Sequence, residues 1–330
     1  MNAHLSWLSV TRGHAPLIVS MPHTGSDIPA EIETRFVSPW FARKDADWWV
    51  HLLYDFAPAL GATTVRTSLS RSVIDVNRDP SGRSLYPGQN TTELCPTTTF
   101  DGEPLYRENE LPDADEITQR CDLYFTPYHA ALESEIARLG SRHPRIVLFE
   151  AHSIRSRIPR LFDGELPNFN IGTNSGSSCA PELPEAIEAA CGAGSLSPRG
   201  GERVAVRGCS TQDTESKNSS ANKKTDIPAS RSGETPSPQP SPPIPGEREK
   251  YFTCVTNGRF KGGWTTRHYG EPDKGIHAVQ LELAIRGYMD EPDQPTPENW
   301  PTQYDPERAA PMRAVLQQIL ETCLSFASSS

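Results

Sequence analysis

Short runs of apolar and β-branched residues alternate along the chain with longer segments in which apolar residues recur every three or four positions. The short runs are typical of strands buried on both faces of a sheet. They lie at residues 16–21, 62–67, 72–76, 145–150 and 277–283. The longer segments predict amphipathic helices at residues 49–60, 117–139, 181–191 and 306–326. Because strands alternate with helices, we expect an α/β fold, a three-layer sandwich around a central mixed, largely parallel sheet.

The alternating pattern stops between Ser195 and Lys250. Only nine of these 56 residues are apolar, and the segment ends in a proline-rich stretch, PSPQPSPPIP. So few apolar side chains cannot offset the entropy lost on ordering the backbone. We therefore predict one domain made of residues 1–194 and 251–330, interrupted at 195–250 by a disordered Pro/Ser-rich insertion with a polyproline-like end. Proline motifs can dock in the grooves of adaptor modules, but we expect a passive insertion without a protein partner.

The composition argues against several classes of protein. The formal net charge is −10, from 42 acidic and 32 basic residues among 330, so neither nucleic acid nor an anionic membrane is an expected partner. No apolar run approaches the ~18 residues of a membrane helix, and the N-terminus lacks the pattern of a secretory leader. The seven cysteines are scattered and form no C-x-x-C motif, which argues against a disulfide framework or a cysteine zinc site. We expect a cytoplasmic enzyme or binding protein.

Two histidines follow predicted strands. His23 comes two residues after the strand at 16–21, and His152 comes directly after the strand at 145–150. Ligands of α/β sheets collect at the carboxyl ends of the strands. Two imidazoles at that edge can converge on one zinc ion. We therefore predict a metal site that includes both histidines.

A hydrolytic zinc site commonly adds one carboxylate ligand and keeps a further position for water. Asp45 and Asp47 both come just before the helix expected near Trp48. Of the two, we predict Asp47 as this ligand. The alternative role of these aspartates is to cap that helix. Asp27 and Glu150 remain open as ligands.

A pair of arginines brackets the predicted strand at 72–76. Arg71 comes before this strand, while Asn77 and Arg78 come at its carboxyl end. Guanidinium groups bind carboxylates bidentately, and a neighbouring amide fixes the orientation, so the segment suits a small anionic ligand. The alternative is a surface pair with Asp75 or Asp79.

Glu282 lies at the end of the last predicted strand. A carboxylate there could act as general base on a metal-activated water. The alternative is an ion pair with Arg286. His129, in the middle of a predicted helix beside Tyr128, is expected to be a packed histidine and not a ligand.

Several long motifs together resemble the N-formylglutamate amidohydrolase family. They are MPHTGSDIP, DWWVHLLYDF, SRSVIDVNRDP, SLYPGQNTTELCPTTTFDGEPLY, PYHAALESEI, EAHSIRSRIPRLFDGELPNFNIGTNSGSSC, NGRFKGGWTTRHYG and HAVQLELAIRGYMDE. The likeness covers nearly all of residues 16–192 and 252–292 in order. It implies a zinc-dependent hydrolase related in fold to zinc carboxypeptidases and aspartoacylases. The expected reaction is hydrolysis of N-formyl-L-glutamate to formate and L-glutamate, the last step of one route of histidine degradation.

The resemblance also implies roles for single residues. His23 and His152 match zinc ligands of the superfamily, Asn77 and Arg78 its substrate-carboxylate pair, and Glu282 its general base. The common His-x-x-Glu spacing is absent because Ser26 stands three residues after His23. This departure leaves the carboxylate ligand open and is a second reason to consider Asp47.

The basic segment NGRFKGGWTTRHYG carries Arg259 and Arg267. We expect one of these arginines to hold the second carboxylate of the substrate, the alternative being a solvated basic turn. Arg71 is the expected cation that stabilises the oxyanion formed during hydrolysis.

Two rival functions remain open. The first is hydrolysis of another N-acyl amino acid by an enzyme of the same superfamily. The second is a catalytically weakened binding or adaptor protein, because family members often have His where this chain has Trp49 and because the chain carries the insertion.

Overall fold

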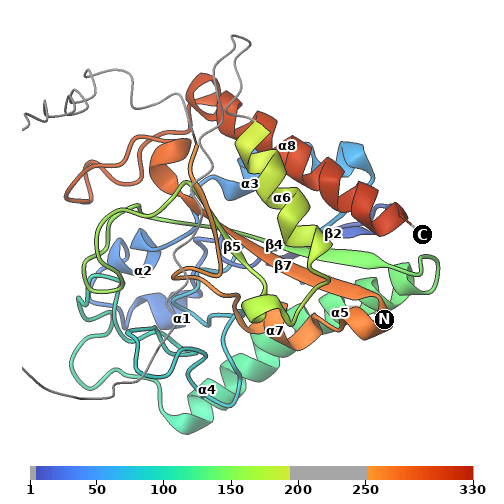
Figure 1. Ribbon diagram of the computed structural model, residues 1–330. Coiled ribbons are helices and arrows are strands. Elements are labelled where there is room, and N and C mark those ends of the chain that lie inside the picture. The colour runs from blue at the N-terminus through green and yellow to red at the C-terminus, as the bar shows by residue number, and fades with distance from the viewer. Residues whose placement is uncertain (1–4, 194–251, 330) are drawn as a thin grey trace, which may run out of the picture. The chain divides into compact units, whose positions relative to one another are not determined.

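The computed structural model describes residues 5–193 and 252–329, which carry a seven-stranded sheet of order β1-β3-β2-β4-β7-β5-β6 (Figure 1). Strands β2, β3, β4 and β7 are parallel to one another, whereas β1 runs antiparallel to β3 and β5 antiparallel to β7. The expected α/β fold with a mixed, largely parallel sheet is therefore confirmed. The strands are β1 (Leu8–Thr11), β2 (Leu17–Met21), β3 (Thr63–Thr67), β4 (Ile146–Ile154), β5 (Phe169–Gly172), β6 (Cys254–Thr256) and β7 (Ile276–Ala284).

Two layers of helices enclose this sheet. Helices α3, α6 and α8 cover one face, and α4, α5 and α7 cover the other (Figure 1). Alternate residues of β2 divide between these layers, since Leu17 and Val19 pack in the first core and Ile18 packs in the second. The α-helices are α1 (Ala30–Glu33), α2 (Phe41–Lys44), α3 (Val50–Leu53), α4 (Ala114–Arg120), α5 (Thr126–Gly140), α6 (Glu182–Ala193), α7 (Trp264–Tyr269) and α8 (Pro306–Ser328). The 3₁₀-helical turns are η1 (Ala57–Leu60), η3 (Asn174–Gly176), η4 (Pro272–Lys274) and η5 (Ile285–Gly287), and η2 (Cys121–Phe125) is π-helical.

The longest helical predictions are confirmed. Helices α6 and α8 match the periodic segments at 181–191 and 306–326, and α4, η2 and α5 together match the segment at 117–139. The segment at 49–60 is different, because it breaks into the short helices α3 and η1. Trp49 adopts a left-handed conformation, φ 64°, just before α3, and Pro58 lacks the backbone donor that a continuous helix would need.

The predicted strand at 72–76 is wrong. Its backbone follows turns and not a ladder, with Val73 N bonded to Ser70 O and Asp75 N bonded to Leu94 O. Its apolar side chains are nevertheless buried in the second core. A short buried apolar run has the same sequence pattern in a strand and in a buried loop.

A second correction concerns β4. This strand continues to Ile154, so His152 lies inside it and not after it. The extension is possible because β7 pairs with β4 along its whole length, up to Ile154 opposite Ala284. The extra residues carry the end of β4 beyond the end of β2 at Met21.

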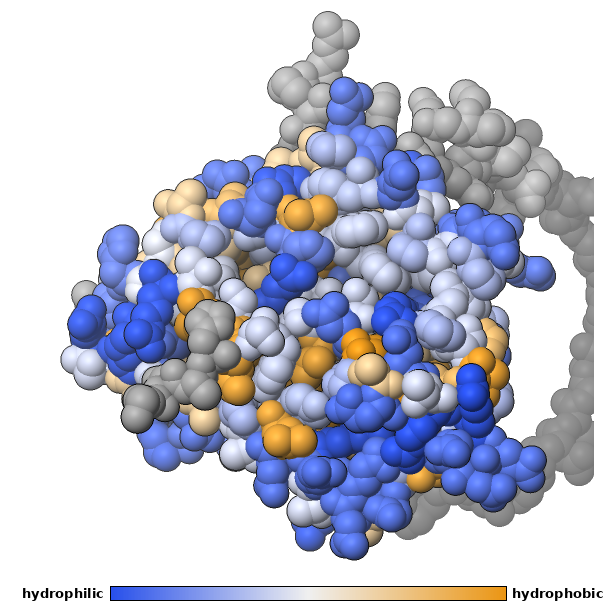
Figure 2. All heavy atoms as spheres, turned by 180° about the vertical axis from the view of Figure 1, so that it is seen from behind, coloured by the Kyte–Doolittle hydropathy of each residue, from blue (hydrophilic) through white to orange (hydrophobic). Residues whose placement is uncertain are grey.

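The predicted insertion at 195–250 lies outside the described residues. Among the described helices, none is long and apolar enough to cross a membrane. On the face shown in Figure 2, polar and charged side chains surround small, separate apolar patches.

Candidate active site

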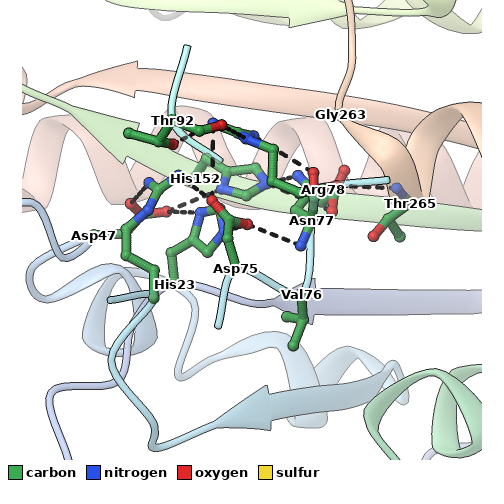
Figure 3. Close-up of polar contacts among 12 residues, drawn as sticks. His23, Asp47, Asp75, Val76, Asn77, Arg78, Thr92, His152, Gly263 and Thr265 are labelled. Carbon is green, nitrogen blue, oxygen red and sulfur yellow. Dashed lines mark hydrogen bonds and ion pairs between the residues drawn. The ribbon is translucent and has the colours of Figure 1, made fainter. Parts of the chain in front are cut away.

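The fold brings His23, Asp47 and His152 together, with one ligand atom from each within 4.8 Å of the others. Ser20 pairs with Glu150 across the parallel strands β2 and β4. Two residues further along β4, His152 is therefore level with the turn that carries His23. The backbone N–H of Asp47 donates to the His23 carbonyl at 2.9 Å, which fixes the third member. Figure 3 shows the three side chains pointing toward one another.

The orientation of His23 suits a metal ligand. Its Nε2–H donates to Asp75 Oδ1 at 2.7 Å, which leaves Nδ1 buried without a hydrogen-bond partner among the described residues. Burial, helped by the nearby Arg71 charge, lowers the pKa of His23 and favours the neutral ring. A neutral imidazole with a proton on Nε2 presents the Nδ1 lone pair, which lies 3.8 Å from Asp47 Oδ2.

His152 has a similar arrangement. Its Nδ1 lies 3.0 Å from Asp47 Oδ2, and its Nε2 lies 3.6 Å from Glu150 Oε1, which has no hydrogen-bond partner among the described residues. Burial opposes a charge on His152, but the hydrogen bond to Asp47 and the nearby Glu150 carboxylate outweigh it and raise the pKa of His152 well above the usual value. A cation bound by Asp47 and the two Nδ1 atoms would take the place of the proton on His152 Nδ1.

Two nitrogens and one carboxylate oxygen, with a carboxylate behind each imidazole, form a donor set that fits zinc. The other carboxylates considered from the sequence lie elsewhere. Asp45 accepts from the Phe100 backbone N–H at 2.6 Å. Glu150 lies behind His152 and accepts from Thr266 Oγ1 at 2.9 Å. Asp27 is exposed and forms an isolated bridge with Leu69.

Arg71 and Asp75 form a buried ion pair beside the three ligands. Arg71 Nη2 lies 2.5 Å from Asp75 Oδ2, and its Nη1 lies 4.0 Å from Asp47 Oδ1. Burial disfavours a charged Asp75, but Arg71, Arg78 and His23 hold its pKa well below the usual value. The predicted alternative of a surface pair was therefore right about the partner and wrong about the location, because Asp75 is fully buried. The sequence reasoning missed its role behind His23, although its place two residues before Asn77 was a signal that both could face one site.

Asn77 and Arg78 lie at the edge of the same group (Figure 3). Asn77 Nδ2 is 3.1 Å from His152 Nε2, and its Oδ1 accepts from the Thr265 backbone N–H at 2.9 Å. Arg78 donates from Nε and Nη2 to the Thr92 carbonyl and hydroxyl, each at 3.0 Å. Its nearest carboxylate oxygen, on Asp75, is 3.8 Å away.

A cavity that is open to solvent joins these residues. Arg259 lines it and donates only to the Leu161 and Asn90 carbonyls, with no carboxylate within 4.0 Å among the described residues. Arg267 is outside the lining and donates to the Gly262 carbonyl at 2.9 Å. The lining also includes His23, Arg71, Asn77, Arg78, Phe100, His152 and Glu282.

Glu282 lies beside His152, its Cα partner across β4 and β7. Its Oε2 accepts from Gln280 Nε2 at 3.2 Å. Burial raises the pKa of Glu282 to about 8, although the His152 charge opposes the shift. The alternative pair with Arg286 is absent among the described residues, because the Arg286 guanidinium faces Glu165 instead, at 3.8 Å.

Trp49 and His129 lie away from the three candidate metal ligands. Trp49 is not part of the cavity lining, and its Nε1 donates to the Thr302 carbonyl at 2.9 Å. His129 is packed as expected, with its ring nitrogens 2.8 Å from the Val76 carbonyl and 3.0 Å from the Tyr269 hydroxyl.

Comparisons with known proteins agree with the resemblance of the motifs. A profile of the family described as N-formylglutamate amidohydrolase matches residues 15–221 and 229–289. Two similar proteins, the N-formylglutamate deformylases of Pseudomonas aeruginosa and Pseudomonas putida, are 38% and 37% identical over 319 residues, which are 97% of this chain and 96% of each relative.

Solved structures share the fold. A crystal structure of an N-formylglutamate amidohydrolase from Ralstonia eutropha matches with a TM-score of 0.62 and 20% identity over 97% of both chains. A gene product of Agrobacterium tumefaciens matches with a TM-score of 0.61 and 15% identity, over 98% of this chain and 96% of the other.

Proposed function

Because the chain belongs to the N-formylglutamate amidohydrolase family and is an amidohydrolase, we propose that it uses a zinc ion to hydrolyse N-formyl-L-glutamate to formate and L-glutamate. The observation that carries this proposal is the convergence of His23, Asp47 and His152 beside a cavity that is also lined by Arg78 and by Arg259, which has no carboxylate within 4.0 Å among the described residues. His23, Asp47 and His152 would hold the zinc ion, which would supply Lewis acidity for the formyl oxygen and lower the pKa of a bound water to about 7.

The charge of the cavity supports a substrate with two carboxylates. Arg78 and Arg259 both line it, and each spends its hydrogen bonds on neutral acceptors. Arg259 has no carboxylate within 4.0 Å in the described part of the chain, and the nearest carboxylate oxygen to Arg78 is that of Asp75 at 3.8 Å, so a carboxylate ligand could bind both guanidinium groups bidentately. In the proposed complex, Asn77 and Arg78 bind the α-carboxylate and Arg259 binds the side-chain carboxylate. Arg267, the other predicted candidate, donates to a backbone carbonyl outside the cavity lining.

Glu282 is the proposed proton carrier. It accepts a proton from the attacking water and returns it to the departing amino group. Its raised pKa, about 8, comes from burial and suits a carboxyl that holds a proton during the reaction. A cation at the three ligands would lower this pKa and favour the ionised form that accepts the proton first.

Arg71 is the proposed stabiliser of the oxyanion. Its guanidinium lies between Asp75 and Asp47 and lines the cavity. The ion pair with Asp75 fixes it in place before the substrate arrives, so little reorganisation is needed when negative charge develops on the formyl oxygen.

The proposal includes a metabolic role as the last step of one route of histidine degradation. This part rests on the resemblance of the motifs alone. In a strain that lacks this gene and grows on histidine, it predicts accumulation of N-formyl-L-glutamate.

A panel of N-acyl amino acids tests the substrate. Zinc-loaded protein should release glutamate fastest from N-formyl-L-glutamate, compared with N-acetyl-L-glutamate and N-formyl-L-aspartate. Faster turnover of another member would favour the rival hydrolase, and no turnover of any member would favour the binding protein. The position of Trp49 outside the cavity lining speaks against the second rival.

A further inference from the structure

Phe100 forms one wall of the cavity from the tip of a tight turn. The turn is closed by hydrogen bonds from Thr99 N to the Glu103 carbonyl at 2.9 Å and from Gly102 N to the Thr99 carbonyl at 3.0 Å. The backbone N–H of Phe100 donates to Asp45 Oδ2 at 2.6 Å. Asp45 is two residues before Asp47, so the turn is attached directly to the segment that carries a proposed metal ligand.

Ion pairs with two buried cations hold the turn from both sides. Lys44 Nζ lies 2.6 Å from Asp101 Oδ2 and 2.7 Å from Glu103 Oε1. Arg155, at the end of β4, lies 2.6 Å from the same Asp101 oxygen. Lys44 and Arg155 are 3% and 6% exposed, whereas the Asp101 and Glu103 side chains are 28% and 34% exposed, so water screens these pairs in part. The turn is therefore a fixed part of the site.

The ring of Phe100 packs between Arg71 and an apolar cluster. The Arg71 guanidinium carbon lies 4.8 Å from the ring centroid, within the range of a cation–π contact. Behind the ring lies a small core made of Ile154, Ile158, Leu166 and Ala284. Because this core is close-packed, the ring cannot move away from the cavity without disturbing it.

The reacting carbon of an N-acyl amino acid carries three groups. In the proposed complex its oxygen faces the metal ligands and Arg71, and its nitrogen leads to the carboxylates held by Arg78 and Arg259. The third group is hydrogen in a formyl amide and carbon in every larger acyl amide. It must face the wall that remains beside Arg71, and Phe100 is the apolar lining residue in contact with that arginine.

We propose that Phe100 is a specificity-determining residue that selects formyl over larger acyl groups by occupying the space that a methyl group would need. This inference rests on the proposed function and deepens it. A rigid wall discriminates because neither the ring nor its turn can yield to the extra carbon without losing packing or ion pairs.

The test compares N-formyl-L-glutamate with N-acetyl-L-glutamate, using glutamate release as the common measurement. The zinc-loaded full chain is compared with Phe100→Leu, Phe100→Ala and the control Phe162→Ala. Phe162 packs against the same apolar cluster but does not line the cavity. The quantity of interest is the kcat/KM for the acetyl substrate divided by that for the formyl substrate.

We expect this ratio to rise about 10-fold or more in Phe100→Ala, less in Phe100→Leu, and not at all in Phe162→Ala, since one methyl group in a pocket is worth about 10- to 200-fold. If Phe100 only supports Arg71, both substrates lose kcat/KM equally, the ratio stays constant, and the inference is wrong. If Phe100→Ala does not fold, Phe100→Leu alone decides by the same criterion. A wild-type chain that turns over neither substrate contradicts the proposed function, whereas wild-type turnover with constant ratios contradicts only the role of Phe100.

Discussion

At the scale of single residues, the polar groups behind the imidazoles decide which nitrogen of each ring faces the site. Asp75 accepts from His23 Nε2, and Asn77 and Glu150 lie beside His152 Nε2, so both Nδ1 atoms turn toward Asp47. Asp75 is in turn balanced by Arg71. The same buried ion pair therefore fixes a proposed metal ligand and a proposed oxyanion stabiliser.

Substitutions can distinguish the roles of Arg259 and Arg267, the two candidate arginines of the basic segment. In Arg259→Ala, the KM for N-formyl-L-glutamate should rise about 10- to 100-fold, because a charge-assisted hydrogen bond to the side-chain carboxylate is lost. Arg267→Ala is the matched control, with a KM within about threefold of the wild type. N-formyl-L-methionine, which has no side-chain carboxylate, should be nearly insensitive to both changes. An equal loss on both substrates in Arg259→Ala would assign this arginine another role.

At this scale the sequence was enough to select candidate site residues but not to predict which groups they contact. His23 and His152 could be selected because each is close to the end of a buried apolar run. The selection between Arg259 and Arg267 could not be made, because it depends on which of them faces a cavity formed by distant segments. The burial of Asp75 also depends on contacts between distant segments, so the residues next to it in the sequence could not predict it.

At the scale of elements, the site is built mainly from connections and not from helices. His23, Asp47, Asp75 and Asn77 all lie outside regular strands, and His152 and Glu282 lie near the ends of β4 and β7. Periodicity predicts long helices such as α5 and α8 because their buried faces repeat over many turns. It mistook residues 72–76 for a strand because a buried loop can be equally apolar.

Gly263, which immediately precedes α7, lies against the side chain of Asn77, so a substitution at Gly263 should disturb that side chain. A Cβ at Gly263 would lie 2.3 Å from Asn77 Nδ2, so Gly263→Ala must displace this amide from Thr265 and His152. We expect kcat/KM to fall about 10-fold or more while the unfolding midpoint changes little. The control is Gly140→Ala at the end of α5, where an added Cβ meets nothing within 4 Å. Unchanged activity in Gly263→Ala would show that the position of Asn77 is not critical.

The packing of α5 predicts a pH dependence of stability. Burial lowers the pKa of His129 from 6.5 to about 4. The folded chain therefore disfavours the proton that the unfolded chain binds below pH 6.5, and stability is lost as the pH falls from 6.5 to 4. For this residue the loss in the free energy of unfolding should reach about 3 kcal/mol at pH 4.

Denaturant unfolding at pH 7 and pH 4 isolates this contribution. His129→Gln should be less stable at pH 7, because the Val76 and Tyr269 contacts change, but it should lose about 3 kcal/mol less than the wild type on acidification. His14→Gln, at an exposed position, should behave as the wild type. The same acid-induced loss in His129→Gln would mean that other groups cause it.

At the scale of the whole molecule, the alternation of strands and helices was enough to predict the fold class. The order of the strands was not predictable, because it is set by packing between segments more than 100 residues apart in sequence, such as β2 and β4. Strands β1, β5 and β6 were missed because they are three or four residues long, too short for a clear pattern. The sheet is mixed because of two antiparallel pairings, β1 with β3 and β5 with β7.

The insertion gives a prediction at the same scale. Helix α6 and strand β6, on either side of residues 195–250, are in contact, and Thr256 Oγ1 donates to Glu188 Oε1. A short Gly/Ser linker in place of the insertion should therefore leave kcat/KM within about threefold of the full chain, since closure costs depend weakly on loop length. A much larger loss of activity would show that the insertion takes part in catalysis or folding.

The central claim is that His23, Asp47 and His152 hold the zinc ion on which hydrolysis depends. Its most direct test is formate release from N-formyl-L-glutamate by chelator-treated protein during titration with Zn²⁺, with bound metal measured in parallel. We expect no turnover without metal, saturation at one zinc per chain, and loss of both zinc binding and turnover in His152→Ala. Full turnover by the metal-free chain, or full zinc occupancy in His152→Ala, would contradict it.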